Sequence, residues 1–423
     1  MQISMQAKEA NSVLEKDCPS IYSLLSEAGR KAFFPKSGIL AQTAEAKGSR
    51  YNATIGIALD DSGDPLSLDC LVKNSGFDAK DTVLYSPSYG QKALRKKWLD
   101  RIKEKNPSLG SKTTLPVVTN AITHGLSIAG RMLVDDGGKM ILPDMFWGNY
   151  NLVFQHAEFD TFEAFSGGKF NVDGLREKLG QNPGKQVILL NFPNNPTGYS
   201  ATVDDVDGIL SAIEESAEKG NKIAVLCDDA YFGLFFEDDV FKESVFSKLA
   251  GLHENVLAVK LDGLTKEMYA WGLRVGFMTF GYKGLTGPAA TVLEDKVSGM
   301  VRGSVSNVCT HSQSLALKAL DDPALPDQEK MNYGILRSRY SEVRKVLSDR
   351  RYSERFEPLP FNSGYFMCIR LKTADAESVR KKLLEDYSTG LIATGDLLRI
   401  AFSSISKDKL RDLFDNIFKA CNG

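Results

Sequence analysis

Short apolar runs alternate with helix-length amphipathic stretches between about residues 116 and 282, and this alternation restricts the fold more than any other feature. One amphipathic stretch, Thr202–Lys219, opens with Thr202 as a helix N-cap and has acidic residues in its first turn. Alternation of this kind predicts an α/β domain around a mostly parallel sheet. The predicted strands are Lys139–Pro143, Gln186–Phe192, Lys222–Asp228, Asn255–Leu261 and Gly276–Gly281.

The sequence pattern changes after Asp321. Asp327–Asp349 and Ala374–Tyr387 are typical of exposed amphipathic helices. Tyr365–Leu371 and Leu397–Phe402 are typical of strands bordered by turn residues. We therefore expect a large domain at residues 56–321 and a smaller α+β domain at 322–423. Residues 1–55 are expected to form an N-terminal arm that returns to the smaller domain.

Composition and charge argue against several classes of partner. The 423 residues include 52 Lys and Arg and 54 Asp and Glu, and the net charge of −2 gives no electrostatic reason to expect nucleic acid or an anionic membrane. The longest apolar runs fall short of a membrane span, and residues 1–17 lack the apolar core of a secretory signal. The six cysteines and four histidines show neither C-x-x-C nor metal-ligand spacing, so we expect no disulfide framework, no metal site and a cytoplasmic location.

Three short segments carry residues suited to chemistry. Asp262–Gly276 places Lys266 after a strand, with glycine, arginine and glycine six, eight and ten positions later. Asn191–Gly198 reads Asn-Phe-Pro-Asn-Asn-Pro-Thr-Gly at the end of another strand, where α/β proteins usually bind ligands. Asp228–Tyr231 ends the next apolar run, and a carboxylate at a buried strand end needs a cation or a donor. Taken singly, Lys266 is more typical of a solvated lysine and the Asp-Asp pair of a helix cap, while the Asn-Pro-Thr-Gly turn fits a loop equally well.

In this order and spacing, the three segments resemble those of the fold-type I pyridoxal-phosphate-dependent aminotransferases, and the motifs are most similar to those of aspartate aminotransferases. The resemblance extends from about Ile55 to Ser403. It implies a large domain whose mostly parallel sheet lies in an α/β/α sandwich, together with a smaller α+β domain. It also implies pyridoxal 5′-phosphate as the cofactor.

The resemblance assigns roles to four residues around the cofactor ring. Lys266 would bind the cofactor aldehyde as a Schiff base and, once freed by the substrate, would move the α-proton as general base and acid. Asp228 would pair with the pyridine nitrogen and keep it protonated, so that the ring withdraws electrons. Tyr231 and Asn195 would donate hydrogen bonds to the phenolic oxygen of the cofactor, and Asn195 would also lie beside the substrate.

The resemblance further implies a phosphate site. Arg274 matches the arginine that binds the cofactor phosphate through its planar fork. Val118–Leu126 resembles the loop whose amides hold that phosphate at the start of a helix, with Ile122 and Thr123 as the contact residues. The chain departs from the family at Gly263, where a serine is common, so fewer side-chain donors are expected to reach the phosphate.

Two aromatic residues lie in segments that resemble family motifs. In Asp144–Tyr150, Trp147 would stack on the pyridine ring, although a tryptophan at such a place is also typical of a core. Tyr85-Ser-Pro-Ser-Tyr-Gly resembles the segment that sends a tyrosine to the phosphate of the neighbouring subunit. Tyr85 would then cross the interface of a homodimer with shared active sites.

Two arginines would bind the substrate. Arg399 lies in the predicted strand Leu397–Phe402, and the resemblance makes it the clamp on the substrate α-carboxylate, which favours loss of the α-proton. A structural salt bridge is the alternative for a buried arginine. Val301–Asn307 resembles the stretch whose arginine, supplied by the partner subunit, binds a distal carboxylate, so Arg302 would select aspartate or glutamate. An exposed arginine at a helix end fits Arg302 equally well.

Ping-pong transamination between an L-amino acid and a 2-oxo acid is therefore the expected function, with aspartate or glutamate as the expected substrate and an aromatic amino acid as the alternative. A C–S β-lyase would use the same Lys266, Asp228 and Arg399 and would release pyruvate and ammonia from cystathionine. A non-enzymatic regulator domain is disfavoured, because the motifs begin within the first ninety residues and leave little room for a helix-turn-helix module. A nicotinamide dehydrogenase is disfavoured because no G-x-G-x-x-G opens a helix after a strand.

Overall fold

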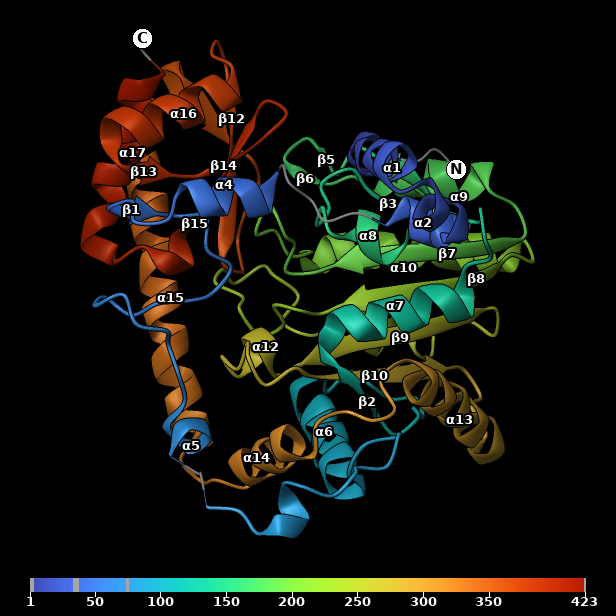
Figure 1. Ribbon diagram of the computed structural model, residues 1–423. Coiled ribbons are helices and arrows are strands. Elements are labelled where there is room, and N and C mark those ends of the chain that lie inside the picture. Colours follow the sequence, from blue (N-terminus) through green and yellow to red (C-terminus); the bar gives the residue numbers. More distant parts are fainter. Residues whose placement is uncertain (1–3, 33–37, 74–75, 422–423) are drawn as a thin grey trace.

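Seven strands form the central sheet, in the order β2-β10-β9-β8-β7-β3-β4 (Figure 1). The computed structural model describes residues 4–32, 38–73 and 76–421. Neighbouring strands are parallel except at β10, which is antiparallel to both β2 and β9. The expected mostly parallel sheet is therefore confirmed. Its strands are β2 (Val117–Asn120), β3 (Lys139–Pro143), β4 (Glu158–Phe162), β7 (Lys185–Asn191), β8 (Lys222–Asp228), β9 (Val256–Gly263) and β10 (Val275–Tyr282).

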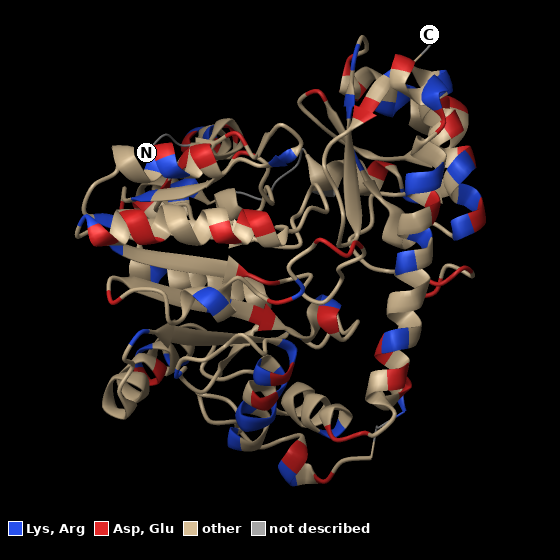
Figure 2. Ribbon diagram, turned by 180° about the vertical axis from the view of Figure 1, so that it is seen from behind, with Lys and Arg blue, Asp and Glu red and all other residues tan. Residues whose placement is uncertain are grey.

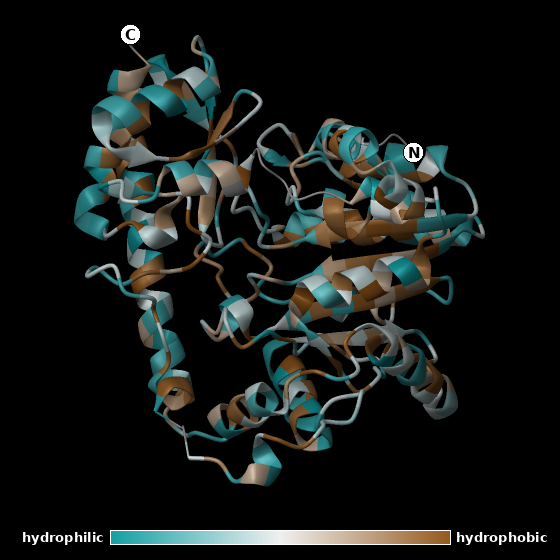
Figure 3. Cartoon of the chain, in the orientation of Figure 1, coloured by the Kyte–Doolittle hydropathy of each residue, from teal (hydrophilic) through white to brown (hydrophobic). Residues whose placement is uncertain are grey.

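Both faces of this sheet are buried, which explains why its strands are continuous apolar runs. In β7, Val187 and Leu189 belong to one hydrophobic cluster, whereas Ile188 and Leu190 belong to another. Because successive side chains of a strand point to opposite faces, the two clusters lie on opposite sides of the sheet. The strands are coloured as hydrophobic in Figure 3, and the expected α/β/α sandwich is confirmed. Helices α6 (Lys92–Lys105) and α7 (Ala121–Leu133) contribute to the first cluster, and α9 (Val172–Gln181), α10 (Val203–Glu218) and α11 (Phe246–Leu249) to the second.

The start of α10 shows how local sequence fixes a helix boundary. The Thr202 hydroxyl accepts a hydrogen bond from the Asp205 backbone N–H, and the Asp205 carboxylate accepts one from the Thr202 N–H. This capping box satisfies two N–H groups that a helix start leaves without partners. The helix predicted over Thr202–Lys219 is thus confirmed, one residue shorter at each end.

A second, antiparallel sheet has the order β11-β12-β15-β14. The predicted strands Tyr365–Leu371 and Leu397–Phe402 correspond to β12 and β15. An N-terminal segment packs beside this sheet, because the Gln42 side chain exchanges two hydrogen bonds with the backbone of Ala393, at 3.1 and 2.8 Å. The elements of this region are α4 (Ile39–Glu45), β1 (Tyr51–Asn52), β11 (Phe356–Pro358), β12 (Phe366–Leu371), α16 (Ala376–Tyr387), β13 (Thr389–Gly390), β14 (Ile392–Thr394), β15 (Leu397–Ala401) and α17 (Leu410–Ala420), with β1 parallel to β13.

A long helix, α15 (Leu325–Leu347), links the two sheets, and Figure 2 shows charged residues spaced along it. Near its start, Glu329 accepts a hydrogen bond from Arg101 of α6 at 2.5 Å. Further along, the Tyr333 hydroxyl donates to the Phe235 carbonyl at 2.5 Å, and α15 also packs on α17. The amphipathic helix predicted at Asp327–Asp349 is therefore present, displaced by two residues.

The remaining elements are short or peripheral. Within the described ranges, no helix is both long and apolar enough to cross a membrane. The remaining α-helices and strands are α1 (Met5–Asp17), α2 (Pro19–Leu24), α3 (Glu27–Lys31), α5 (Asp69–Val72), α8 (Tyr150–Val153), β5 (Phe165–Ser166), β6 (Lys169–Phe170), α12 (Leu264–Glu267), α13 (Gly287–Ser304) and α14 (Thr310–Leu320).

Candidate active site

The candidate site lies at the edge of the central sheet where several strands end. β7 ends at Asn191, β8 ends at Asp228, and β9 leads directly into the short helix that carries Lys266. A cavity of about 390 Å³ opens there, which is a usual size for a small-ligand site. Ligands of α/β proteins bind at the carboxyl ends of strands, so the location fits a catalytic site. Nine of the eleven predicted site residues line the cavity: Ile122, Thr123, Trp147, Asn195, Asp228, Tyr231, Lys266, Arg274 and Arg399.

The first turn of α7 forms one wall of the cavity and is held by unusual backbone geometry. Ala121 and Arg274 both adopt left-handed backbone conformations, with φ of 62° and 54°, and the Ala121 N–H donates to the Arg274 carbonyl at 3.1 Å. A Cβ atom on Gly276 would lie 2.6 Å from the Ala121 carbonyl carbon and 2.7 Å from the Ile122 nitrogen, so only glycine allows β10 to approach this closely. Backbone strain of this kind collects at functional sites. The free amides of a helix start, beside Arg274, make this wall suitable for an anion.

The charges in the cavity favour an anionic ligand. Three cations, Lys266, Arg274 and Arg399, face a single carboxylate, that of Asp228, among the described lining residues. The Arg274 guanidinium uses one N–H to reach the Trp271 carbonyl at 3.0 Å and has further donors available. An excess of positive charge inside a cleft raises the local concentration of anions, which suits a ligand with phosphate and carboxylate groups.

Asp228 and Lys266 are both buried, and burial shifts their pKa values toward neutrality. Burial raises the pKa of Asp228 to about 6, although the Tyr150 hydroxyl, which donates to its Oδ2 atom at 2.5 Å, opposes this shift. Burial lowers the pKa of Lys266 to about 8. Within the described ranges Lys266 makes no hydrogen bond or ion pair, and its Nζ atom lies 4.8 Å from the centroid of the Tyr231 ring. A lysine with a lowered pKa and no partner can act as a nucleophile or a base.

Arg399 is buried on β15 without a carboxylate partner among the described residues. Its Nη1 atom donates to Asn195 Oδ1 at 3.3 Å and its Nη2 atom to the Thr54 carbonyl at 3.1 Å. The Nε atom is buried and has no acceptor in the part of the chain that the structure describes. The guanidinium lies over the Phe366 ring, 4.4 Å from its centroid. The structural salt bridge considered as an alternative is therefore not observed, and the guanidinium can still receive a carboxylate.

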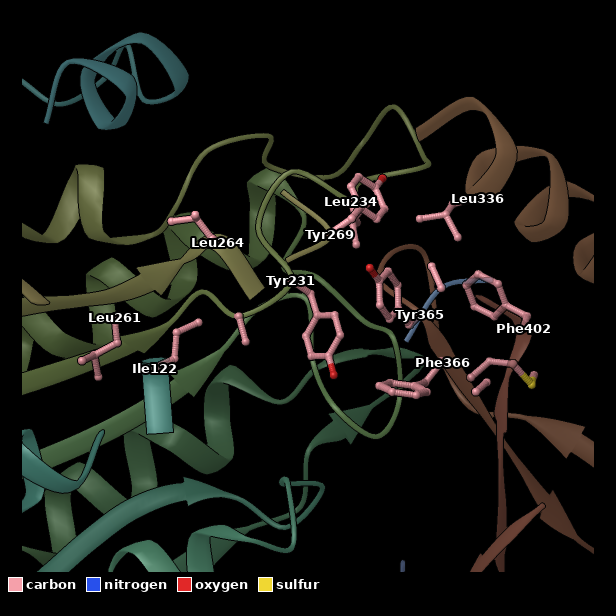
Figure 4. Packing of buried hydrophobic residues seen from close by; sticks show 14 of the residues in the cluster. Ile122, Tyr231, Leu234, Leu261, Leu264, Tyr269, Leu336, Tyr365, Phe366 and Phe402 are labelled. Carbon is pink, nitrogen blue, oxygen red and sulfur yellow. The ribbon is translucent and has the colours of Figure 1, made fainter. Parts of the chain in front are cut away.

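Aromatic side chains complete the wall between the two sheets. Figure 4 shows Tyr231 between Ile122 and Phe366. The ring of Tyr231 makes edge contacts with Tyr365 at 5.2 Å and with Phe366 at 5.6 Å. Burial raises the pKa of Tyr231, so its hydroxyl stays protonated and can donate a hydrogen bond.

Comparison with known proteins identifies the family. The family model described as aminotransferase class I and II matches residues 53–417. This chain belongs to the class I and II aminotransferases. One relative is the aspartate aminotransferase of Thermotoga maritima, which is 25% identical over 338 residues that make up 78% of this chain and 80% of the relative. Another is the histidinol-phosphate aminotransferase of Staphylococcus carnosus, which is 26% identical over 206 residues that make up 47% of this chain and 51% of the relative. An aminotransferase structure from Anaerococcus prevotii has the same fold, with a TM-score of 0.83 at 23% identity, covering 95% of this chain and 100% of that one.

Class I and II aminotransferases use pyridoxal phosphate, which is therefore the cofactor of this chain. The residues present fit that cofactor. Lys266 is unpaired among the described residues, Asp228 is a buried carboxylate in the same cavity, and the first turn of α7 beside Arg274 provides donors for a phosphate. Because residue 276 is glycine, β10 packs directly against that turn without displacing its backbone.

Two predicted residues of this aminotransferase lie outside the cavity. Tyr85 is 90% exposed, and Arg302, on α13, is exposed and donates to the Ser306 hydroxyl at 2.8 Å. Neither side chain lines the cavity of its own chain. Their assigned roles require a second subunit, and they stay predictions.

Several residues of the site were not predicted from the sequence. Tyr150 contacts Asp228 from α8, and Thr54 fixes Arg399 through its carbonyl group. Ile39 and Thr43 of α4 also line the cavity. Only Tyr150 offered a signal, because a buried tyrosine usually needs an acceptor for its hydroxyl. The other three lie in a segment without a recognisable motif.

Proposed function

We propose that this aminotransferase moves an amino group between an L-amino acid and a 2-oxo acid by a ping-pong mechanism. The observation that carries the proposal is the Arg399 guanidinium, which shares a cavity with Lys266 and has a buried Nε atom without an acceptor among the described residues. A planar guanidinium binds a carboxylate in bidentate fashion, and α-amino acids and 2-oxo acids share that group. The first oxo acid leaves before the second binds, because both occupy the same site.

The roles proposed for the residues follow from their chemistry. Lys266 would hold the cofactor covalently and, when released, would move the proton at the substrate Cα, since its pKa of about 8 leaves part of it neutral near pH 7 to 8. Asp228 would hold the pyridine nitrogen in its protonated form. Bound pyridoxal phosphate supplies an electron-withdrawing ring that stabilises negative charge at Cα. Asn195 and Tyr231 would donate to the phenolic oxygen, and Trp147 would stack on the ring.

The phosphate would bind at the first turn of α7. Ile122 and Thr123 would contribute backbone amides, and Thr123 a hydroxyl group in addition. Arg274 would add a charged fork beside the turn. We further propose a homodimer in which Tyr85 of the partner subunit reaches this phosphate, since Tyr85 is 90% exposed on its own chain.

Aspartate or glutamate is the proposed substrate. The three cations that line the described cavity, Lys266, Arg274 and Arg399, have other proposed roles. A second carboxylate on the substrate side chain would therefore need a fourth cation. We assign this role to Arg302 of the partner subunit. The names of relatives such as the Thermotoga maritima aspartate aminotransferase agree with this assignment. An aromatic amino acid is the second candidate, because Ile39, Ile55 and Phe366 give the cavity an apolar side. No disulfide joins any cysteines in the described part of the chain, which supports the cytoplasmic location that we propose.

An absorption spectrum of the purified protein tests the proposal directly. The visible band of the bound cofactor should shift on addition of L-aspartate and return on addition of 2-oxoglutarate, and Lys266→Ala should abolish turnover. Arg302→Ala should lower kcat/KM for aspartate more than for phenylalanine. An equal loss for the two substrates would remove Arg302 from substrate selection. Pyruvate and ammonia released from cystathionine without an oxo acid would instead identify a C–S β-lyase.

A further inference from the structure

Tyr150 is a buried phenol in direct contact with the carboxylate of the candidate site. It begins α8, three residues after Trp147, and only 1% of its surface is exposed. Its hydroxyl donates to Asp228 Oδ2 at 2.5 Å across 78 positions of sequence. None of the roles assigned from the sequence motifs explains this hydrogen bond.

The surroundings of Tyr150 hold its ring in one place. Its ring is stacked on Phe146 at 6.3 Å, makes an edge contact with Trp147 at 5.5 Å, and tilts against Phe154 at 5.8 Å. Its backbone N–H donates to the Trp147 carbonyl at 2.9 Å. A ring packed on three sides cannot swing away, so the hydroxyl stays directed at Asp228.

The Asp228 carboxylate is held by two donors and faces few charges. The Ala230 backbone N–H donates a hydrogen bond to Oδ1 at 3.1 Å, and the Tyr150 hydroxyl donates one to Oδ2. The titratable groups that act on Asp228 are Lys266, its chain neighbours Cys227 and Asp229, and the two phenols Tyr150 and Tyr231. Each carboxylate oxygen has two lone pairs, so this arrangement fixes the plane of the group and leaves acceptor capacity toward the cavity.

We propose that Tyr150 is a positioning residue for the reaction: its hydroxyl keeps the Asp228 carboxylate ionised and oriented toward the cavity, and its ring supports Trp147. One side chain then sets two of the groups that are assigned to the cofactor ring, Asp228 and Trp147. This inference rests on the proposed function, because it gives Asp228 and Trp147 the roles stated there.

The pH dependence of the site follows from the same contact. Burial raises the pKa of Asp228 to about 6, and the hydrogen bond from Tyr150 works against that rise. Loss of the hydroxyl therefore raises this pKa further. Asp228 would take up a proton as the pH falls through a higher value than in the wild type, and a neutral carboxyl cannot stabilise a protonated pyridine nitrogen.

Tyr150→Phe in the cofactor-loaded enzyme tests this inference. We expect the acid limb of the pH profile of kcat to move to higher pH by about one unit, since a hydrogen bond to a charged group contributes about 10-fold or more. The dissociation constant of pyridoxal phosphate, followed by its visible absorption between pH 5.5 and 8.5, should rise about 10-fold at the acid end and less at pH 8.5. The KM for the amino acid should change by less than about twofold, because Arg399 is untouched.

Tyr199→Phe is a matched control. Tyr199 is another buried phenol, and its hydroxyl donates a hydrogen bond of 2.5 Å to the Asp205 carboxylate. Neither residue lines the cavity. This variant should lose similar thermal stability while keeping the cofactor affinity and the pH profile of the wild type. Tyr150→His, which can again place an N–H donor near Asp228, should restore part of the acid limb.

Identical cofactor affinities and pH profiles for Tyr150→Phe and Tyr199→Phe would overturn the inference and leave Tyr150 a packing residue. If Tyr150→Phe does not fold, Tyr150→Leu, which also removes the hydroxyl donor, provides the same comparison. Absence of transamination by the wild-type protein would contradict the proposed function instead. The cofactor titration does not depend on any amino acid substrate, so it separates the two failures.

Discussion

At the scale of single residues, Lys266 should lower the stability of the cofactor-free protein. Burial lowers its pKa from 10.5 to about 8, so the folded state holds its proton less tightly than the unfolded chain. Stability due to this group therefore rises with pH between about 8 and 10.5, and below pH 8 the charged lysine costs about 3 kcal/mol. Lys266→Met should abolish transamination and yet stabilise the cofactor-free protein at pH 7.5. Urea unfolding at pH 7.5 and pH 10 measures the free energy of unfolding of the variant and of the wild type. The difference between the two values should be smaller at pH 10.

The control for this prediction is Lys219→Met, which changes an exposed lysine after α10. It should alter stability by less than about 0.5 kcal/mol at either pH. If Lys266→Met were less stable than the wild type at pH 7.5, the attraction of the buried cation to its surroundings would outweigh the cost of removing it from water.

Arg399→Lys should separate charge from geometry at the proposed carboxylate site. A lysine keeps the positive charge but cannot reproduce the bonds that the guanidinium makes to Asn195 and the Thr54 carbonyl, nor a bidentate contact to substrate. We expect kcat/KM to fall by about 10- to 150-fold, corresponding to about 1.5–3 kcal/mol. The loss should be similar for every amino acid tested, since all carry an α-carboxylate. A loss confined to aspartate would assign Arg399 to the side chain instead.

Residues within short motifs at strand ends could be predicted from the sequence, whereas residues that reach the site through tertiary contacts could not. Lys266 and Asp228 follow apolar runs directly, so their place at the sheet edge was visible. Thr54 joins Arg399 across 345 positions, and Tyr150 joins Asp228 across 78. The Thr54 contact leaves no periodic or compositional signal, and the sequence around Tyr150 does not indicate which acceptor its hydroxyl contacts.

At the scale of elements, the closeness of β10 to α7 should control cofactor binding. A methyl group at position 276 would collide with the backbone of Ala121 and Ile122, which is rigid and cannot yield as a flexible side chain would. Gly276→Ala should therefore displace the first turn of α7 and weaken pyridoxal phosphate binding by about 10-fold or more, in line with the 1–3 kcal/mol typical of overpacking. Gly272→Ala is the matched control, since a methyl group at that position would have nothing within 4 Å. Equal affinities for the two variants would show that the turn adapts.

A buried ion cluster on β9 should make folding dependent on pH. Lys260 is 1% exposed and lies between the Asp229 carboxylate and that of Asp262, the latter at 3.5 Å. Burial raises the pKa of Asp262 to about 7, although Lys260 opposes the rise. Lys260→Met should destabilise the protein by about 3–5 kcal/mol at pH 8, because two buried carboxylates lose their cation.

The sign of the pH effect follows from the raised pKa of Asp262. The folded state binds this proton more tightly than the unfolded chain, so stability increases as the pH falls through about 7. The defect of Lys260→Met, measured by urea unfolding, should therefore be smaller at pH 5.5 than at pH 8. The double variant Lys260→Met/Asp262→Asn should recover part of the loss at pH 8. A defect independent of pH would mean that packing, and not charge, is responsible.

Central strands were predictable because both of their faces are buried, which produces uninterrupted apolar runs. Lys139–Pro143 and Lys222–Asp228 have the predicted bounds. β4 was not predicted, because among the described strands this edge strand pairs with β3 alone, and its sequence, Glu-Phe-Asp-Thr-Phe, is partly charged and mostly half-buried. The helix α1 was also not predicted, and its two buried residues, Ala7 and Asn11, form no continuous apolar stripe.

At the scale of the whole molecule, the described chain provides most of the proposed site but leaves Tyr85 and Arg302 on its surface. The segment around Tyr85 is strongly apolar and exposed, with Val83 75% and Leu84 60% accessible. Exposed apolar patches of this kind often mark protein interfaces. The proposed dimer would cover this segment and bring the two residues to the cavity of the partner subunit, and it stays a prediction.

Mixed dimers would decide whether Arg302 acts across the interface. A Lys266→Ala chain paired with an Arg302→Ala chain forms one site with neither residue and one site with both, provided that Arg302 serves its partner. Random exchange between the two variants makes about half of the dimers mixed, so the aspartate activity should reach about a quarter of the wild-type value. Each variant alone should remain below that level. Activity is measured after the two proteins are unfolded together and refolded with pyridoxal phosphate.

The matched control is a mixture of Lys266→Ala with Arg399→Ala. Lys266 and Arg399 line the same cavity of one chain, so every site in these mixed dimers lacks one of them. No activity should return, whatever the efficiency of exchange. Recovery in the first mixture but not in the second would establish an active site shared between subunits and place Arg302 in it. Failure of the first mixture, with mixed dimers demonstrated by mass spectrometry, would return Arg302 to the role of a surface residue and favour an apolar side chain in the substrate.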